Sequence, residues 1–197
     1  MGGKLKKFTR IVAVAAAATM ATVGFIAAPS HAASKVKVGI AYDIGGRGDK
    51  SFNDSAAAGL DRAKKKWGLA SKEITVTQGT DSERTDKLRL LAQAGYSPII
   101  AVGFLYAGPI TTLSQEFPNT QFGIIDDASV AALNVTSMVF SEEQGSYLAG
   151  VAAALSSKSG KIGYVGGVRI PLLQKFEAGF VAGVKATKKS ATVDVKY

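Results

Sequence analysis

The sequence predicts an α/β protein with a doubly wound parallel sheet, and two observations lead to this prediction. Short runs of β-branched and apolar residues alternate with longer segments of helical periodicity after residue 33. Strands separated by helices are joined by crossover connections and therefore run parallel. Glycines and acids follow several predicted strands, as at Asp43 and Asp126, where such a sheet gathers its binding loops. The chain of 197 residues, 47% hydrophobic and 20% charged, has a globular composition.

The predicted elements follow in order along the chain. Strands are expected at 36–42, 74–77, 99–102, 122–125, 135–140, 161–165 and 192–195. Helices are expected at 52–66, 83–94, 105–117, 142–155 and 172–186. A capping box at Ser51 and Asp54 marks the first helix start. Gly68 and Gly95 lie just past helix ends, and Pro109 falls in a first turn.

Residues 1–32 have the features of a secretory signal peptide. Four basic residues in the first ten precede an Ala-rich apolar run over 11–28, and small residues lead to a cleavage site near Ala32. A membrane anchor is the alternative, but the run is short, weakly hydrophobic and followed by Pro29. We therefore expect an exported protein, secreted or in the cell envelope, whose mature chain begins close to Ala33.

The mature chain would lack the residues of most hydrolytic sites. The sequence has no cysteine, and its only histidine, His31, lies in the predicted signal peptide. Catalysis by an imidazole base, a thiolate or a zinc ion is thereby excluded. A glycosidase pair of carboxylates at Asp126 and Asp127 is the remaining enzymatic alternative, although the sequence does not fix their separation. We expect no enzyme, no cofactor and no metal site.

The charge balance does not favour a nucleic-acid partner. The formal net charge is +9, and removal of the signal peptide, with four of the 24 basic residues and none of the 15 acids, leaves +5. Several cations cluster at 62–66 on one predicted helix. This cluster has no interleaved aromatic residues or polar base readers, so it is interpreted as a solvated helix face.

The ends of the predicted strands favour a binding cleft at one edge of the sheet. They are Asp43-Ile-Gly-Gly46, Gly79-Thr-Asp81, Gly103-Phe104, Asp126-Asp127 and Gly166-Gly167. The first of these leads into a near P-loop over 45–51, but Asp49 stands where the motif needs lysine, which disfavours a phosphate site. No dinucleotide-binding G-x-G-x-x-G is present here either.

A neutral polar ligand with an aromatic face fits these residues better. Asp43 and Asp126 can accept hydrogen bonds, Asn53 can donate and accept, and Phe52 can stack on a ring. Phe52 is also in phase with the apolar stripe of its helix, which runs to Trp67, so core packing is its alternative role. A turn or helix cap is the alternative for the two adjacent acids, and one of them is expected to take that role.

A weak internal repeat suggests two similar lobes. The segment 37–60 contains a strand, a double glycine, an aromatic residue near the helix start and a small-residue helix face, and 161–180 repeats this order. We expect lobes at 33–137 and 138–197 that face each other. Chance similarity between two βα units is the alternative.

The motifs resemble those of the basic membrane protein family, substrate-binding components of ABC importers that include bacterial purine-nucleoside receptors. The resemblance is carried by Asp43-x-Gly-Gly-x-x-Asp-Lys-Ser-Phe-Asn53, Phe122-Gly-Ile-Ile-Asp126, Phe140-x-Glu-Glu-Gln-Gly-Ser-Tyr-Leu-Ala-Gly150, Lys161-Ile-Gly-x-Val-Gly-Gly167 and Pro171-x-x-x-x-Phe-Glu-Ala-Gly-Phe-x-Ala-Gly183. It implies a type I periplasmic-binding-protein-like fold, a purine nucleoside in an interlobe cleft and an ABC permease as partner. A receptor or sensor of this fold for a sugar or another small signalling molecule is the alternative.

The resemblance also implies a set of ligand-binding residues. Asp43, Phe52 and Asn53 would lie at the ligand, with Phe52 stacked on the base and Asp126 reading it from the first lobe. Gly103 and Gly167 would give backbone access. Phe176 is added from the internal repeat.

Two departures from the family pattern bear on these expectations. Members usually carry a lipid-anchoring cysteine at the end of the signal peptide, and this chain has none. The chain also stops at Tyr197, where relatives continue. We therefore expect a protein without that anchor, with a complete first lobe and a partial second lobe; a non-functional fragment is the alternative.

Overall fold

The computed structural model describes residues 36–197, and the predicted signal peptide over 1–32 lies outside them. Within the described part, no helix is long and apolar enough to cross a membrane. The first elements are β1 (Lys37–Tyr42), α1 (Phe52–Trp67), β2 (Ala70–Thr75), α2 (Asp81–Gln93), β3 (Ile99–Val102), η1 (Phe104–Tyr106), α3 (Ala107–Glu116), β4 (Phe122–Ile125) and β5 (Val135–Met138). They are followed by α4 (Glu142–Ser156), β6 (Lys161–Val165), α5 (Pro171–Thr187) and β7 (Thr192–Lys196).

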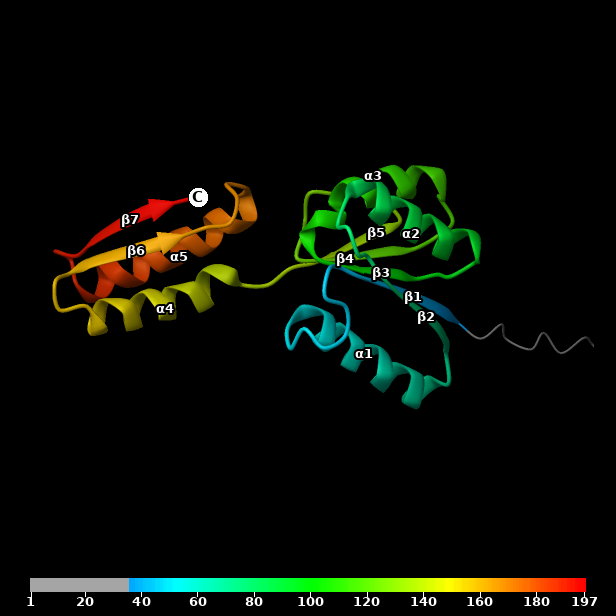
Figure 1. Cartoon of the computed structure of the whole chain (residues 1–197), viewed down its shortest axis with the longest axis horizontal. Helices are drawn as coiled ribbons and strands as arrows, with labels where there is room; N and C mark the ends of the chain where they lie inside the picture. Colours follow the sequence, from blue (N-terminus) through cyan, green and yellow to red (C-terminus); the bar gives the residue numbers. More distant parts are fainter. Residues whose placement is uncertain (1–35) are drawn as a thin grey trace, which may run out of the picture. The chain divides into compact units, whose positions relative to one another are not determined.

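The first five strands form a parallel sheet in the order β2-β1-β3-β4-β5. Helix α1 covers one face, and α2 and α3 cover the other (Figure 1). Side chains of β1 alternate accordingly: Ile40 and Tyr42 pack in the cluster with Leu60 of α1, whereas Ala41 packs in the cluster with Leu88 of α2. Both faces are therefore buried, which confirms the predicted doubly wound α/β class.

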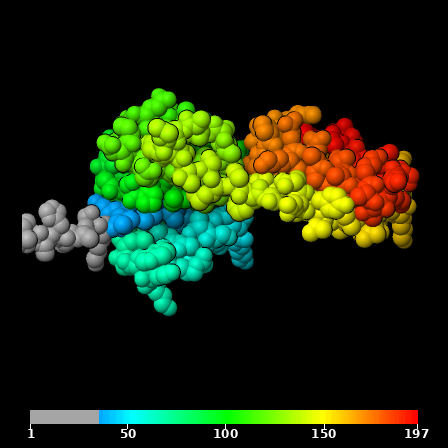
Figure 2. Space-filling view, turned by 180° about the vertical axis from the view of Figure 1, so that it is seen from behind, coloured from blue at the N-terminus to red at the C-terminus, as the bar shows by residue number. Residues whose placement is uncertain are grey.

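Strands β6 and β7 pair in parallel in a separate sheet. Their residues alternate between exposed and half-buried, so the strands bury one face, and the small core beside them contains Ala154, Val184 and Ala191. Helices α4 and α5 pack in direct contact (Figure 2, yellow and orange). A Cβ atom at Gly183 would overlap the backbone of Tyr147, so this close approach requires glycine.

Three local predictions are wrong. Strand β2 begins at Ala70 and not at residue 74, because it is an edge strand with a mixed polar sequence that gives no apolar signal. Ser51 makes no side-chain cap, since Asp54 instead accepts hydrogen bonds from loop amides. Trp67 does not join the α1 stripe, because it is the last residue of the helix and 67% exposed.

The two sheets are formed by residues 37–138 and 161–196. Gly166 and Gly167 consequently follow a strand of the second sheet, whereas the other four strand ends belong to the first sheet. The prediction that five strand ends share one sheet edge is wrong for this pair. The lobe bounds 33–137 and 138–197 stay a prediction.

Candidate functional site

A cavity of about 400 Å³ lies at the carboxyl ends of β1, β3 and β4. Parallel strands end at the same edge of a sheet, so the loops that follow them meet there. The lining residues are Asp43, Ile44, Asp49, Phe52, Asn53, Arg84, Val102, Gly103, Phe104, Leu105 and Asp126. Five of the seven predicted site residues are therefore brought together: Asp43, Phe52, Asn53, Gly103 and Asp126.

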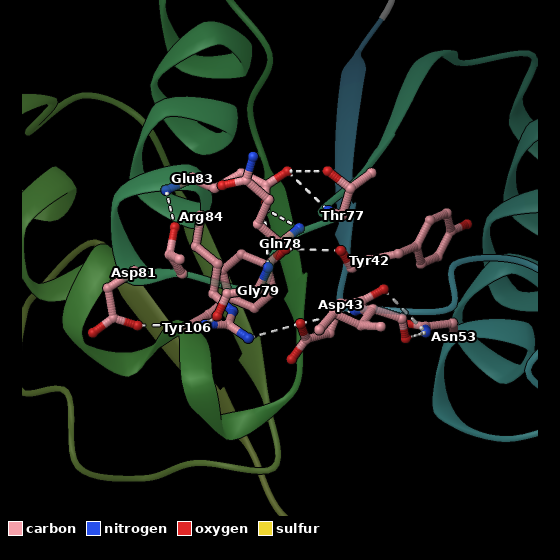
Figure 3. Close-up of polar contacts among 12 residues, drawn as sticks. Tyr42, Asp43, Asn53, Thr77, Gln78, Gly79, Asp81, Glu83, Arg84 and Tyr106 are labelled. Atoms are coloured by element: carbon pink, nitrogen blue, oxygen red, sulfur yellow. Dashed lines mark hydrogen bonds and ion pairs between the residues drawn. The ribbon is translucent and has the colours of Figure 1, made fainter.

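Asp43 follows β1 directly and is held by an ion pair. Its Oδ1 accepts hydrogen bonds from Nη2 of Arg84 and from the backbone N–H of Ile44, each at 2.9 Å (Figure 3). The Arg84 side chain is only 3% exposed, and its guanidinium carbon lies 5.6 Å from the ring centroid of Tyr106. Burial raises the pKa of Tyr106, and its hydroxyl donates to the carbonyl of Tyr42 at 2.8 Å. This end of the cavity is thus built from a rigid polar network.

The loop between β1 and α1 is folded around Asp49. Its carboxylate accepts hydrogen bonds from the backbone N–H groups of Ser51, Asn53 and Asp54. Desolvation opposes ionisation of Asp49, but these hydrogen bonds hold its pKa below the ordinary value. The acid that interrupts the P-loop pattern therefore orders the start of α1.

Asn53 is buried beneath this loop. Its Nδ2 lies 3.5 Å from the carbonyl oxygens of Asp43 and Ile44, and its Oδ1 is buried without a hydrogen-bond partner among the described residues. Buried polar atoms are almost always paired, so a lone acceptor at a cavity wall marks a place where a ligand can bind.

Asp126 directly follows β4 and has φ of 74°, a left-handed backbone conformation that is rare outside glycine. Its N–H donates to the carbonyl of Met138 at 2.8 Å, which fixes the residue at the sheet edge. Its Oδ1 is buried, and no residue of the described chain pairs with it. Burial, and then the charges of Glu142 and Asp127, raise the pKa of Asp126. The carboxyl group is therefore poorly satisfied within the described part of the protein.

The neighbouring acid has a different role. Oδ1 of Asp127 accepts hydrogen bonds from the N–H and the hydroxyl of Ser129, both at 2.7 Å. Asp127 is thus the turn residue of the pair, which confirms that one of the two acids takes this role.

Phe52 is not a core residue, because 45% of its surface is exposed. Its ring meets that of Phe140 edge to face, with centroids 5.9 Å apart. A further cavity, of about 670 Å³, is lined by Phe52, Asp126 and Phe176 together with Phe140 and Glu142. Phe176 therefore shares a cavity with two residues of the first one, whereas Gly167 lies in an exposed loop and lines neither.

Sequence reasoning missed Arg84 and Glu142. Glu142 is buried, accepts a hydrogen bond from the N–H of Phe140 and pairs with Lys175 at 3.4 Å. Arg84 gave one signal that could have been used. It lies at the fourth position of α2, where a cation opposes the helix dipole unless a nearby acid compensates for it.

Comparison with known proteins places the chain in one family. The model of the Bmp family, ABC transporter substrate-binding protein PnrA-like, matches residues 35–197. The chain is 37% identical over 167 residues to the CD4+ T-cell-stimulating antigen of Listeria monocytogenes, covering 81% of the chain and 46% of that protein. It is 33% identical over 205 residues to the ABC transporter nucleoside-binding protein BmpA of Lactococcus lactis, covering 95% of the chain and 56% of that protein. The chain thus spans about half the length of the curated relatives it matches.

Solved structures give the same result. A solute-binding protein of an ABC transporter system from Aeropyrum pernix matches with 32% identity and a TM-score of 0.69, covering 82% of the chain and 46% of that structure. The glucose-galactose-binding protein GanP of Geobacillus stearothermophilus, at 18% identity and a TM-score of 0.61, shares the fold alone. These neighbours confirm the periplasmic-binding-protein-like fold that the sequence predicts. The chain therefore belongs to the PnrA-like family of ABC transporter substrate-binding proteins.

Proposed function

We propose that this protein binds a purine nucleoside in the cavity at the edge of the first sheet. The observation that carries the proposal is Asp126, which lines the same cavity as the exposed ring of Phe52 and whose Oδ1 is buried without a partner among the described residues. A purine offers a flat ring for stacking and N–H groups for a carboxylate, and this pair of side chains is complementary to both features.

The other walls suit the same ligand. Asp43 and Asn53 add oxygen acceptors for N–H or hydroxyl groups. Gly103 has φ of 113°, a conformation that favours glycine, and its lack of a side chain leaves the backbone open to the ligand. Volume also agrees, because about 400 Å³ lies within the usual range of small-molecule pockets.

The relatives support a role in uptake. A Lactococcus lactis relative is called a nucleoside-binding protein of an ABC transporter, and the family is one of substrate-binding proteins. We infer that this chain acts as a non-enzymatic, extracytoplasmic receptor that delivers its ligand to an ABC permease. Export by the signal peptide over 1–32 is part of this proposal.

The direct test is an NMR titration of the ¹⁵N-labelled chain with inosine, adenosine and ribose. We expect inosine and adenosine, at up to millimolar concentrations, to shift the amide signals of Phe52, Gly103 and Asp126, and ribose to leave them unchanged. Equal responses to ribose and inosine would favour a sugar receptor. No response to either nucleoside would refute the proposal.

A pair of aromatic substitutions tests the stacking role. Phe52→Leu should weaken inosine binding roughly tenfold or more, because base–aromatic stacking contributes about 1–3 kcal/mol per base. Trp67→Leu is the matched control, since it removes an exposed aromatic residue from the opposite end of α1. Equal losses in the two variants would mean that Phe52 does not stack on the base.

A further inference from the structure

Arg84 is the only cation among the residues that line the first cavity, and both of its terminal nitrogens donate hydrogen bonds within the protein. Its Nη1 donates to the carbonyl of Gly79 at 2.6 Å, and its Nη2 donates to Asp43 at 2.9 Å (Figure 3). Nη1 also lies 3.4 Å from the largely exposed Asp81, whereas Nε is buried without a hydrogen-bond partner among the described residues. The guanidinium is therefore held between the carbonyl of Gly79 and the carboxylate of Asp43, and its contact with Asp43 is an ion pair.

This contact gives the two carboxylate oxygens of Asp43 different roles. Oδ1 accepts from Arg84 and from the N–H of Ile44. Oδ2 has no hydrogen bond among the described residues and lies on the side of Gly103, 3.7 Å from the place of a Cβ atom there. Because Oδ1 is held at both contacts, the side chain cannot rotate without breaking them. Oδ2 is left as the acceptor for a ligand.

The positive charge of Arg84 also offsets part of the negative charge of the cavity walls. Three acids, Asp43, Asp49 and Asp126, line the same walls. With Arg84 absent, these walls would present carboxylates alone and would attract a cation. A guanidinium stays protonated under all ordinary conditions, so its compensation of Asp43 is permanent.

We propose that Arg84 positions Asp43 and offsets its charge, so that this end of the cavity selects uncharged hydrogen-bond donors over cations. The inference rests on the proposed function, since it names the charge class of the ligand that the same site takes. Arg84 acts through Asp43 and is a positioning residue that determines specificity.

The test compares adenosine with 1-methyladenosine, a ligand of similar shape whose base is positively charged at neutral pH. Affinities are measured by NMR titration of the full chain. Wild type should prefer adenosine, and Arg84→Gln should lose about tenfold or more of that preference, in line with the strength of a hydrogen bond to a charged group. Arg84→Lys keeps the charge and should keep most of the preference.

Arg89→Gln is the matched control. Arg89 lies on the same helix but pairs with Asp86 and Glu116, away from the cavity. This variant should keep the wild-type ratio of affinities. In the double variant Asp43→Asn with Arg84→Gln neither charge remains, so the ratio should return toward that of wild type. If Arg84→Gln does not fold, the double variant and Arg84→Lys still test whether the charge of Arg84 sets the preference for adenosine.

A wild-type ratio in Arg84→Gln would overturn the inference, and so would a double variant that behaves like Arg84→Gln. Failure of the proposed function looks different: wild type would respond to neither ligand. In that case the backbone amide signal of Ile44 tests whether Arg84 positions Asp43. Its signal should shift and exchange faster with solvent in Arg84→Gln but not in Arg89→Gln, because Asp43 would no longer be held. An unchanged Ile44 amide would show that Arg84 does not position Asp43.

Discussion

The two sheets of this protein are stabilised by different contacts. The five-stranded sheet is covered by helices on both faces, and large side chains such as Tyr42, Leu88 and Phe122 are fully buried there. The two-stranded sheet has a small core, and Val165 of β6 is 84% exposed. Its stability depends instead on the contact between α4 and α5, whose backbones approach closely at glycine positions such as Gly183.

This difference explains where the candidate site is built. A polar network such as that of Asp43 and Arg84 keeps its geometry only on a rigid support, which the buried core of the first sheet provides. Five of the predicted site residues follow strands of that sheet or begin α1. The second sheet region contributes Phe176, through its helix α5.

The largest expected effect contrasts the two regions directly. Leu88→Ala should lower the free energy of unfolding by about 2–5 kcal/mol, because it leaves a cavity in a packed core. Leu155→Ala in α4 should cost less than about 0.5 kcal/mol, since Leu155 is 74% exposed. Urea unfolding followed by circular dichroism measures both. Similar losses in the two variants would mean that Leu155 is packed as tightly as Leu88 and is not a surface residue.

A smaller effect tests the contact between α4 and α5. Gly183→Ala should destabilise the protein by roughly 1–3 kcal/mol, because the new methyl group overlaps the backbone of Tyr147. Gly145→Ala is matched, since it makes the same change in α4 where nothing lies within 4 Å of the added carbon. This control should gain about 0.5–1 kcal/mol from helix propensity. A neutral Gly183→Ala would show that the helices do not need their close approach.

The smallest effect concerns acid stability. Hydrogen bonds from the N–H of Thr77 and then from other loop groups lower the pKa of Glu83 from 4.5 to about 2. A carboxylate with a depressed pKa in the folded state stabilises that state above pH 4.5, and this contribution is lost as the pH falls toward 2.

Glu83→Gln should therefore flatten the decline of stability between these pH values, measured as the urea midpoint at each pH. Glu142→Gln should flatten this decline less. The Glu142 carboxylate accepts a hydrogen bond from the N–H of Phe140 and one from Lys175, which are fewer contacts than the loop groups make to Glu83. The reverse order would mean that the loop before α2 is not held by Glu83.

Much of the fold follows from the sequence for a physical reason. Strands buried on both faces have continuous apolar runs, so β3 and β4 have the bounds that the sequence predicts. Edge strand β2 and the close helix contact leave no such pattern. For the site, strand ends revealed Asp43 and Asp126, but Arg84 escaped notice because its role depends on a partner 41 positions away.

Among the residues of the candidate site, Asp126 is expected to contribute most to ligand binding, and one comparison tests this. Inosine affinity is measured by NMR titration for the wild-type chain and for Asp126→Asn and Asp127→Asn. Asp126→Asn should weaken binding about ten- to a hundred-fold, which corresponds to the roughly 1.5–3 kcal/mol of a hydrogen bond to a charged group. Asp127→Asn should leave affinity nearly unchanged, since Asp127 bonds to Ser129 in its turn. Equal losses, or a larger loss at Asp127, would contradict the claim that Asp126 is the acid that binds the ligand.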